Sequence, residues 1–167
     1  KNYNMEKNTY NNIKIFEMDN IADKVGESVF SYRDLGDLLF DTSSTPWSKF
    51  YNLDFVKRTG AQFAEGLIFH DNIFWWDILL NGERIYFYRK FLYTRRRHIK
   101  SSTGAGDKRY VSTITINNMI VQKFINHGQF EKYKKRLYGK KLSLVYRRFG
   151  EVQDQFKPFF YSEMKKD

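Results

Sequence analysis

One ten-residue stretch of the chain is apolar on almost every side, and it constrains the fold more than any other feature. It opens with Asp71 and ends before Asn81 and Gly82. Its apolar side chains are Ile73, Phe74, Trp75, Trp76, Ile78, Leu79 and Leu80. A helix that is apolar all round is stable only when it is buried. Because 41 % of the 167 residues are hydrophobic, the chain can build a core around such a helix.

Start and stop signals predict two further helices upstream of this stretch. Ser31, followed three residues later by Asp34, predicts a capped helix. Asn52 as an N-cap and Gly60 after the last turn predict a short helix between them. Helices are therefore expected on both sides of a polar loop.

Short β-like segments complete the first part of the chain. The alternation in residues 13–16 predicts an edge strand, and the polar residues 17–23 predict a loop after it. Residues 47–51 are strand-like, and further strands are predicted at residues 84–88 and 92–94. We therefore expect a few mixed strands beside the buried helices.

The last third of the chain has a helical pattern. Apolar residues from Val111 onward predict a long helix that Gly128 ends. Two or three amphipathic helices are expected after it, with breaks at Gly139, Gly150 and Pro158. The tail is therefore predicted to be a helical extension.

The charge of the chain favours anionic partners. Its 29 lysines and arginines exceed its 19 aspartates and glutamates, which leaves a net charge of +10. Such a field attracts nucleic acid, an anionic membrane or a diphosphate ligand. The lack of cysteine excludes disulfides and thiolate zinc sites, and the three scattered histidines do not make a metal cluster by their spacing.

The same composition bears on where the protein works. No stretch approaches the roughly 18 to 20 consecutive apolar residues that cross a membrane. With no cysteine and no signal peptide, a reducing, cytoplasmic setting is expected. The chain begins at Lys1 without an initiator methionine, and we expect it to be an excised piece.

An ordered series of short motifs lies across residues 30–105. It consists of Trp47-x-Lys49-x-Tyr51, Phe55, Phe63-x-Glu65-Gly66, His70-Asp71-x-x-Phe74, Leu92-Tyr93-x-Arg95-Arg96-x-His98 and Ser101-Ser102. In order, spacing and residue type the series resembles the second half of family-2 glycosyltransferases with the two-layer nucleotide-diphospho-sugar fold. The resemblance implies a partial α/β domain, with the α+β appearance of a fragment. Its acceptor-side half would cover residues 1–106, and residues 107–167 would form a helical C-terminal extension.

The resemblance also implies an activity. Enzymes of this family transfer a sugar with inversion from a nucleotide-diphospho-sugar to a glycan or lipid-linked acceptor, in polysaccharide or glycoconjugate synthesis. Nucleic acid is not among the partners that it implies. The family also needs an upstream nucleotide-binding half and an Asp-x-Asp motif that holds Mn²⁺ or Mg²⁺. Neither is in this chain, since Glu17-x-Asp19 lies too close to Trp47 for the family spacing, so we expect the chain alone to be inactive.

Carried over residue by residue, the resemblance names an acceptor site. The family's Glu-Asp pair at the start of a helix falls on His70 and Asp71, so Asp71 is the implied general base for the acceptor hydroxyl. Trp47, Lys49 and His70 are the implied acceptor-binding residues. Other interpretations stay open: Asp71 as a helix cap, Trp47 as a core residue, Lys49 as a solvated lysine and His70 as a surface or core group.

A second group of residues is implied to bind the donor diphosphate. Arg95, Arg96, His98 and Ser101 resemble the family's mobile segment near the donor, where guanidinium groups bind phosphate in a bidentate manner. The alternative is that this arginine run forms a solvated basic face.

Three hypotheses about function remain. The first is the glycosyltransferase, with a tail that lies on an anionic membrane as a peripheral protein of the inner face. The tail residues that motivate this membrane hypothesis are Lys132, Lys134, Lys135, Arg136, Lys140 and Lys141, interleaved with Phe130, Tyr133, Leu137, Tyr138 and Leu142. The alternatives are a basic nucleic-acid-binding module, whose aromatic residues stack on bases, and a non-catalytic adaptor.

Overall fold

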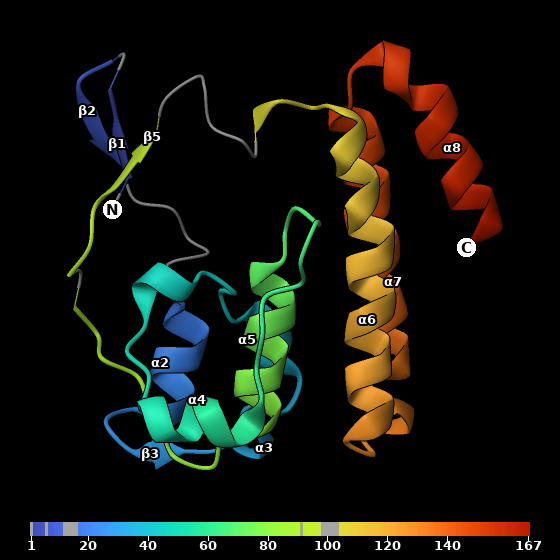
Figure 1. Ribbon diagram of the computed structural model, residues 1–167. Coiled ribbons are helices and arrows are strands. Elements are labelled where there is room, and N and C mark those ends of the chain that lie inside the picture. Colours follow the sequence, from blue (N-terminus) through green and yellow to red (C-terminus); the bar gives the residue numbers. More distant parts are fainter. Residues whose placement is uncertain (1, 6, 12–16, 91, 98–103) are drawn as a thin grey trace.

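A computed structural model describes residues 2–5, 7–11, 17–90, 92–97 and 104–167 of the protein. In these residues helices predominate over short strands, an α+β arrangement (Figure 1). The α-helices and strands are β1 (Asn2–Asn4), β2 (Thr9–Asn11), α2 (Asp19–Val25), β3 (Val29–Phe30), α3 (Tyr32–Leu35), α4 (Leu53–Thr59), α5 (Asp71–Leu80), β4 (Ile85–Tyr86), β5 (Arg95–Arg97), α6 (Ser112–Asn126), α7 (Phe130–Glu151) and α8 (Lys157–Lys166). Short 3₁₀ helices are η1 (Gly36–Asp41), η2 (Pro46–Ser48), η4 (Lys108–Val111) and η5 (Asp154–Phe156).

The strands form two small sheets. In the first, β1 pairs antiparallel with β2 and parallel with β5, so that Asn2 lies opposite Arg95. In the second, β3 pairs antiparallel with β4. The coarse prediction of mixed strands beside helices is confirmed, because both parallel and antiparallel pairs occur.

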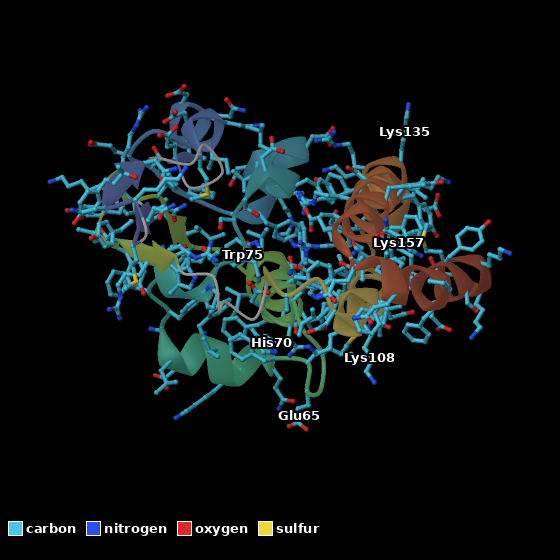
Figure 2. The ribbon with its side chains drawn as sticks, turned by 90° about the horizontal axis from the view of Figure 1, so that it is seen from above. Glu65, His70, Trp75, Lys108, Lys135 and Lys157 are labelled. Atoms are coloured by element: carbon cyan, nitrogen blue, oxygen red, sulfur yellow. The ribbon has the colours of Figure 1, made fainter. Side chains whose placement is uncertain are left out.

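Helix α5 is the centre of the larger hydrophobic cluster, as its apolar pattern predicts. Every apolar side chain from Ile73 to Leu80 is buried. The ring of Trp76 meets that of Phe124 on α6 with 5.0 Å between centroids. Phe124 also stacks on Phe40 of η1, at 5.7 Å. Figure 2 shows Trp75 among the side chains of the interior, whereas Glu65 points away from the body of the molecule.

A second, smaller cluster holds the C-terminal helices together. Its buried members are Tyr110, Ile114, Val145, Val152 and Phe160. Phe69, in the loop before α5, packs against this cluster and also against the larger one. Its ring therefore contacts both clusters.

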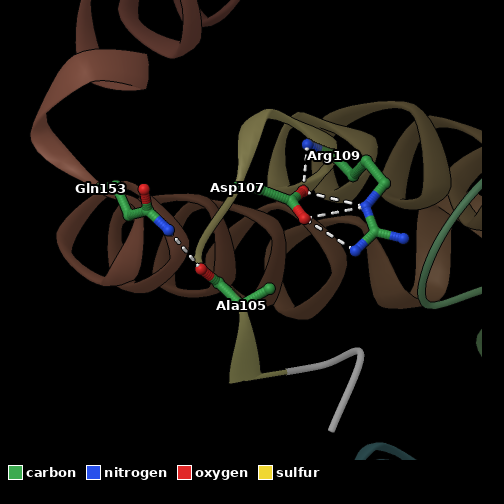
Figure 3. Close-up of polar contacts among 4 residues, drawn as sticks. All are labelled: Ala105, Asp107, Arg109 and Gln153. Atoms are coloured by element: carbon green, nitrogen blue, oxygen red, sulfur yellow. Dashed lines mark hydrogen bonds and ion pairs between the residues drawn. The ribbon is translucent and has the colours of Figure 1, made fainter. Parts of the chain in front are cut away.

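The segment that leads into η4 is fastened to the end of α7 by polar contacts (Figure 3). The Gln153 side chain donates to the Ala105 carbonyl at 2.7 Å, and the Gln153 backbone N–H donates to the Gly106 carbonyl at 2.8 Å. The Asp107 carboxylate accepts from the Arg109 backbone N–H and from its guanidinium, with Nη2 at 2.7 Å. These bonds fix the start of the C-terminal helices.

Several predicted elements are confirmed. Ser31 and Asp34 form the capping box of α3, with the Asp34 carboxylate 2.7 Å from the Ser31 backbone nitrogen. The Asn52 side chain caps α4 by accepting from the Phe55 N–H at 2.9 Å, and Gly60 follows the helix in a left-handed conformation. The long helix α6 and its termination before the left-handed Gly128 are confirmed in the same way.

Other predicted elements are wrong. The expected loop over residues 17–23 contains most of α2, because Ile21 and Ala22 are drawn into the core. Residues 47–51 are not a strand, since they contain the end of η2 and irregular backbone. Residues 92–94 precede a strand rather than form one. The strand expected at residues 13–16 lies outside the described residues.

The expected breaks in the tail are also corrected. Helix α7 runs through Gly139 and Gly150 without interruption. Pro158 lies in the first turn of α8, where a missing N–H costs nothing, so it starts a helix rather than ending one. Among the described helices, none combines the length and the apolar character needed to cross a bilayer.

Candidate functional site

An open cavity of about 1510 Å³ runs along one side of the larger hydrophobic cluster. Its walls come from the loop around η2, from α4 and α5, and from the segment that follows α5. Many of the lining side chains are aromatic: Phe30, Trp47, Phe50, Tyr51, Phe55, Trp75, Tyr86, Phe87, Tyr88 and Tyr93. We call this cavity the aromatic groove.

One wall of the groove is a pair of stacked rings. The Trp47 indole and the Tyr93 phenol lie 4.9 Å apart between centroids, with 30° between their planes. Both rings are exposed, so the interpretation of Trp47 as a core residue is wrong. Stacked, exposed rings offer the flat apolar face on which the apolar face of a sugar ring can pack.

Lys49 lies inside the groove and is held by its own loop. Its Nζ donates to the Ser43 carbonyl at 2.6 Å and to the Thr45 carbonyl at 2.7 Å. The ammonium also lies 4.3 Å from the centroid of the Trp75 ring. Burial lowers the pKa of Lys49 to about 7, and the negative charge of Asp71 opposes that shift. Lys49 is therefore not a solvated lysine.

The Trp75 indole is fixed at its edge as well as at its face. Its Nε1–H donates to the Thr42 hydroxyl oxygen at 3.0 Å, and that hydroxyl donates to the Leu39 carbonyl at 2.7 Å. Trp75 lies one helical turn after Asp71, so both side chains project from the same side of α5. This spacing was the signal in the sequence that could have added Trp75 to the site.

Asp71 is a half-buried carboxyl in the first turn of α5. Burial raises its pKa, while the charge of His70, backbone N–H groups and the charge of Lys49 oppose the shift. Its Oδ1 accepts from the Asn72 side chain at 3.2 Å. The N-cap position belongs to His70, and no side chain caps the helix there.

Asp71 and His70 are not among the residues that line the aromatic groove. Lys49 and Trp75 both line the groove and connect it to Asp71. Lys49 interacts electrostatically with Asp71, and Trp75 lies one turn after it on α5. His70 is exposed, and its ring meets the Phe63 ring edge-on at 5.5 Å. The structure thus brings Trp47, Lys49 and Asp71 to one region.

Phe69, which the sequence did not single out, determines how the chain enters α5. Its φ of 64° is left-handed, a conformation that bulky side chains rarely adopt. The Arg148 guanidinium lies 4.3 Å from the centroid of the Phe69 ring, and the Tyr110 ring meets it edge-on at 5.7 Å. Contacts from the C-terminal helices therefore hold the residue that precedes His70 and Asp71.

The predicted donor-side residues lie elsewhere. Arg95 and Arg96 belong to β5, apart from α5 in Figure 1, and line a second cavity of about 480 Å³ with Met5. His98 and Ser101 lie outside the described residues. The aromatic groove reaches this strand through Tyr93, which lines both cavities.

The described residues do not fit a divalent metal. Within them, no group of three or more histidine or acidic side chains is close enough to hold an ion. Asp19, part of the weak Glu17-x-Asp19 match, instead forms an ion pair with Arg89 at 3.6 Å. The metal that the resemblance implies has no site in this part of the chain.

A buried hydroxyl also belongs to the site. The Tyr51 ring lines the groove, and within the described structure its hydroxyl has no hydrogen-bond partner. Burial raises the pKa of Tyr51 to about 12.

Comparisons of the chain with protein-family models, with curated proteins and with solved structures find no match.

Proposed function

We propose that this chain carries the acceptor-side half of a family-2-like inverting glycosyltransferase, with Asp71 as the general base. The observation that supports the proposal most is the half-buried Asp71, with its raised pKa, beside Lys49 and the aromatic groove. The order of the motifs around it, from Trp47 to Arg96, points to the same family.

The reaction needs one base on this side. The oxygen of an acceptor hydroxyl attacks the anomeric carbon of the donor sugar, and the bond from that carbon to the diphosphate oxygen breaks. Its electron pair leaves with the nucleoside diphosphate, and the hydroxyl proton passes to the Asp71 carboxylate. A raised pKa suits this role, because the carboxylate then binds the proton more tightly than an exposed aspartate does.

The groove suits a glycan acceptor. Rings on its walls can pack against the apolar faces of sugars, and the exposed stack of Trp47 and Tyr93 is the clearest such surface. Lys49 holds the loop that carries Trp47, so its role here is to position that ring. Polysaccharide or glycoconjugate synthesis in the cytoplasm accords with the lack of cysteine.

On the donor side, the resemblance leaves Arg95 and Arg96 to bind the diphosphate, whereas the metal ligands come from the family's upstream half. In the family a divalent metal neutralises the leaving diphosphate, and it is held by an Asp-x-Asp motif upstream. Among the described residues, no group of acidic or histidine side chains is placed to hold it. Activity therefore has to be measured on the full-length product of the gene.

The test is sugar transfer by that full-length protein with Mn²⁺ and a panel of nucleotide-diphospho-sugars. Asp71→Asn should lower transfer and donor hydrolysis by about 10²- to 10⁴-fold, the usual contribution of a general base. Glu131→Gln is the matched control, because Glu131 is also an acidic residue in the first turn of a helix and lies outside the aromatic groove. It should keep most of the activity.

Two results would overturn the proposal. Equal activity of Asp71→Asn and Glu131→Gln would leave Asp71 without a role in the chemistry. No transfer with any donor, together with salt-dependent binding of single-stranded nucleic acid, would favour the nucleic-acid-binding module.

A further inference from the structure

A line of exposed apolar side chains runs along the outer face of α7. Tyr138, Leu142 and Tyr146 are 46 %, 57 % and 65 % exposed. They recur every four residues, so they lie on one side of the helix. The opposite side, with Tyr133 and Leu137, is buried against the core.

This line continues onto α8. The half-buried Phe149 follows Tyr146 on α7, and its ring contacts Tyr161 at 6.3 Å and Phe160 at 5.8 Å. Phe160 is buried, whereas Tyr161 is 51 % exposed. We call Tyr138, Leu142, Tyr146 and Tyr161 the outer stripe. It spans two helices that pack on each other.

Helix α7, which carries most of the outer stripe, is strongly basic. Helix α7 contains Lys132, Lys134, Lys135, Arg136, Lys140, Lys141, Arg147 and Arg148 against only Glu131 and Glu151. Lys135 points away from the body of the molecule in Figure 2. On α8, Lys165 lies 4.6 Å from the centroid of the Tyr161 ring. The stripe thus has a positive rim.

The structure changes which tail residues can take part. Lys140 is turned inward, where it donates to the Phe40 carbonyl, and Lys141 pairs with Asp167 at 2.5 Å. Both therefore bind the protein itself. Lys134, Arg136 and Arg147 stay exposed, and each pairs with one acidic side chain: Glu131, Asp37 and Glu151, respectively. Lys135 is exposed as well.

We propose that the outer stripe and its basic rim dock on the surface of an anionic lipid bilayer. A straight line of rings and one aliphatic side chain on an outer face can lie in the plane of the interface. Tyrosine suits that plane, because its ring is apolar and its hydroxyl is polar. Lysines at the rim reach anionic headgroups through their flexible stems.

Two features favour lipid over other occupants. Leu142, at the centre of the stripe, has no π face on which a base could stack, but its aliphatic side chain can be buried among lipid acyl chains. A second copy docked on the same face would bring the two positive rims together, and like charges repel. This docking does not depend on the proposed chemistry.

The test is co-sedimentation of the 167-residue chain with vesicles of phosphatidylcholine, with and without about 30 % phosphatidylserine. Binding should require the anionic lipid. Lys135→Gln should weaken it about fivefold, as expected for one lysine near a charged surface. The pair Leu142→Ser and Tyr146→Ser should weaken it at least about tenfold, since two buried apolar groups are lost.

The control is Phe159→Ser, which removes an exposed ring of α8 outside the stripe and should bind as the parent does. Circular dichroism melting of every variant separates lost docking from lost folding. Equal binding to neutral vesicles, or unchanged binding by the Leu142 and Tyr146 variant, would overturn the proposal. So would binding of single-stranded DNA that all these variants retain while no vesicle binds.

Discussion

At the residue scale the site is a pair of ionisable groups, each moved away from its ordinary pKa. Burial lowers the pKa of Lys49 and raises that of Asp71, so desolvation disfavours both charged forms. Each charge stabilises the other, which limits both shifts. Such a pair costs the folded state free energy, and its stability should depend on pH.

The first prediction concerns Asp71→Asn and stability. The folded-state pKa of Asp71 lies above its ordinary value of 3.8, so its ionised form destabilises the fold at neutral pH. We expect Asp71→Asn to raise the free energy of unfolding at pH 7 by up to about 1 kcal/mol. That gain should vanish as the pH falls below the ordinary value, where the carboxyl is protonated in both states.

Urea unfolding at pH 7 and at low pH measures this difference. A helix-capping role makes the opposite prediction, because removing a cap or a first-turn charge lowers stability by about 1 kcal/mol. A loss at pH 7 would therefore restore the capping interpretation of Asp71.

The second prediction concerns Lys49 at high pH. Its folded-state pKa is about 7 against an ordinary 10.5, so between these values the unfolded chain binds more protons. Stability should therefore rise with pH across this window, by an amount on the order of 2 kcal/mol for this group. The contribution is smaller than the full shift implies, because the side chain keeps some contact with water.

The measurement is the free energy of unfolding from pH 7 to pH 10, for the parent and for Lys49→Met. Other groups titrate in this range, so the difference between the two proteins is the quantity to follow. Parallel curves would show that Lys49 keeps its ordinary pKa, held by the carbonyls of Ser43 and Thr45.

At the scale of elements, the glycines show how packing decides between continuing and ending a helix. Gly36 has a φ of 56° and ends α3, although Leu38, Leu39 and Phe40 beyond it keep helical spacing and form η1 instead. Gly139 stays inside α7, because Tyr133, Leu137 and Val145 bury that helix on both sides of it. Their burial outweighs the roughly 1 kcal/mol that a glycine costs within a helix.

The third prediction compares two substitutions of glycine. Gly139→Ala should raise the free energy of unfolding by about 0.5–1 kcal/mol, because its new methyl group would meet no atom within 4 Å. Gly106→Ala should lower it by about 2 kcal/mol or more, since φ is +59° and the Cβ would lie 2.7 Å from the Glu151 carbonyl oxygen. Thermal and urea unfolding of both variants test this order. Destabilisation by Gly139→Ala would mean that α7 needs the glycine.

At the scale of the whole molecule, the two clusters form one structure because α6 and α7 contribute buried side chains to both and Phe69 packs against both. The larger cluster itself takes Ile116 and Phe124 from α6 and Tyr133 from α7, so it draws on both sides of residue 106. Folding of the first part therefore relies on the C-terminal helices.

The fourth prediction tests the strained residue that joins the clusters. Phe69→Ala loses the ring and keeps a left-handed backbone, whereas Phe69→Gly loses the ring and relieves the backbone. Both should be destabilised by about 3 kcal/mol or more, with the glycine variant about 1 kcal/mol more stable than the alanine variant. Leu67 does not have a left-handed backbone, so at that position the alanine variant should be more stable than the glycine variant. Urea unfolding of these four variants measures the order of their free energies of unfolding. If the alanine variant is more stable than the glycine variant at both positions, Phe69 is unstrained.

Local signals predicted much of the fold and some of the site. The caps at Asn52 and Gly60 and the burial of α5 could be predicted, because each depends on neighbours in the sequence. Helix α2 and the irregular loop around η2 could not, because distant side chains decide them. The family resemblance, through the order of the motifs, implied that Lys49 lies near Asp71. The contact between Arg148 and Phe69 could not be predicted, because it joins residues far apart in the chain and no local pattern indicates it.

The position of Phe69 links the packing of the C-terminal helices to the backbone conformation at the entry to α5, two properties that proteins can often change separately. A substitution in α7 or η4 that loosens Arg148 or Tyr110 also releases the backbone just before His70 and Asp71. Under selection, the C-terminal helices and the entry to α5 should therefore vary together. A change tolerated at one of them would depend on which residue already occupies the other.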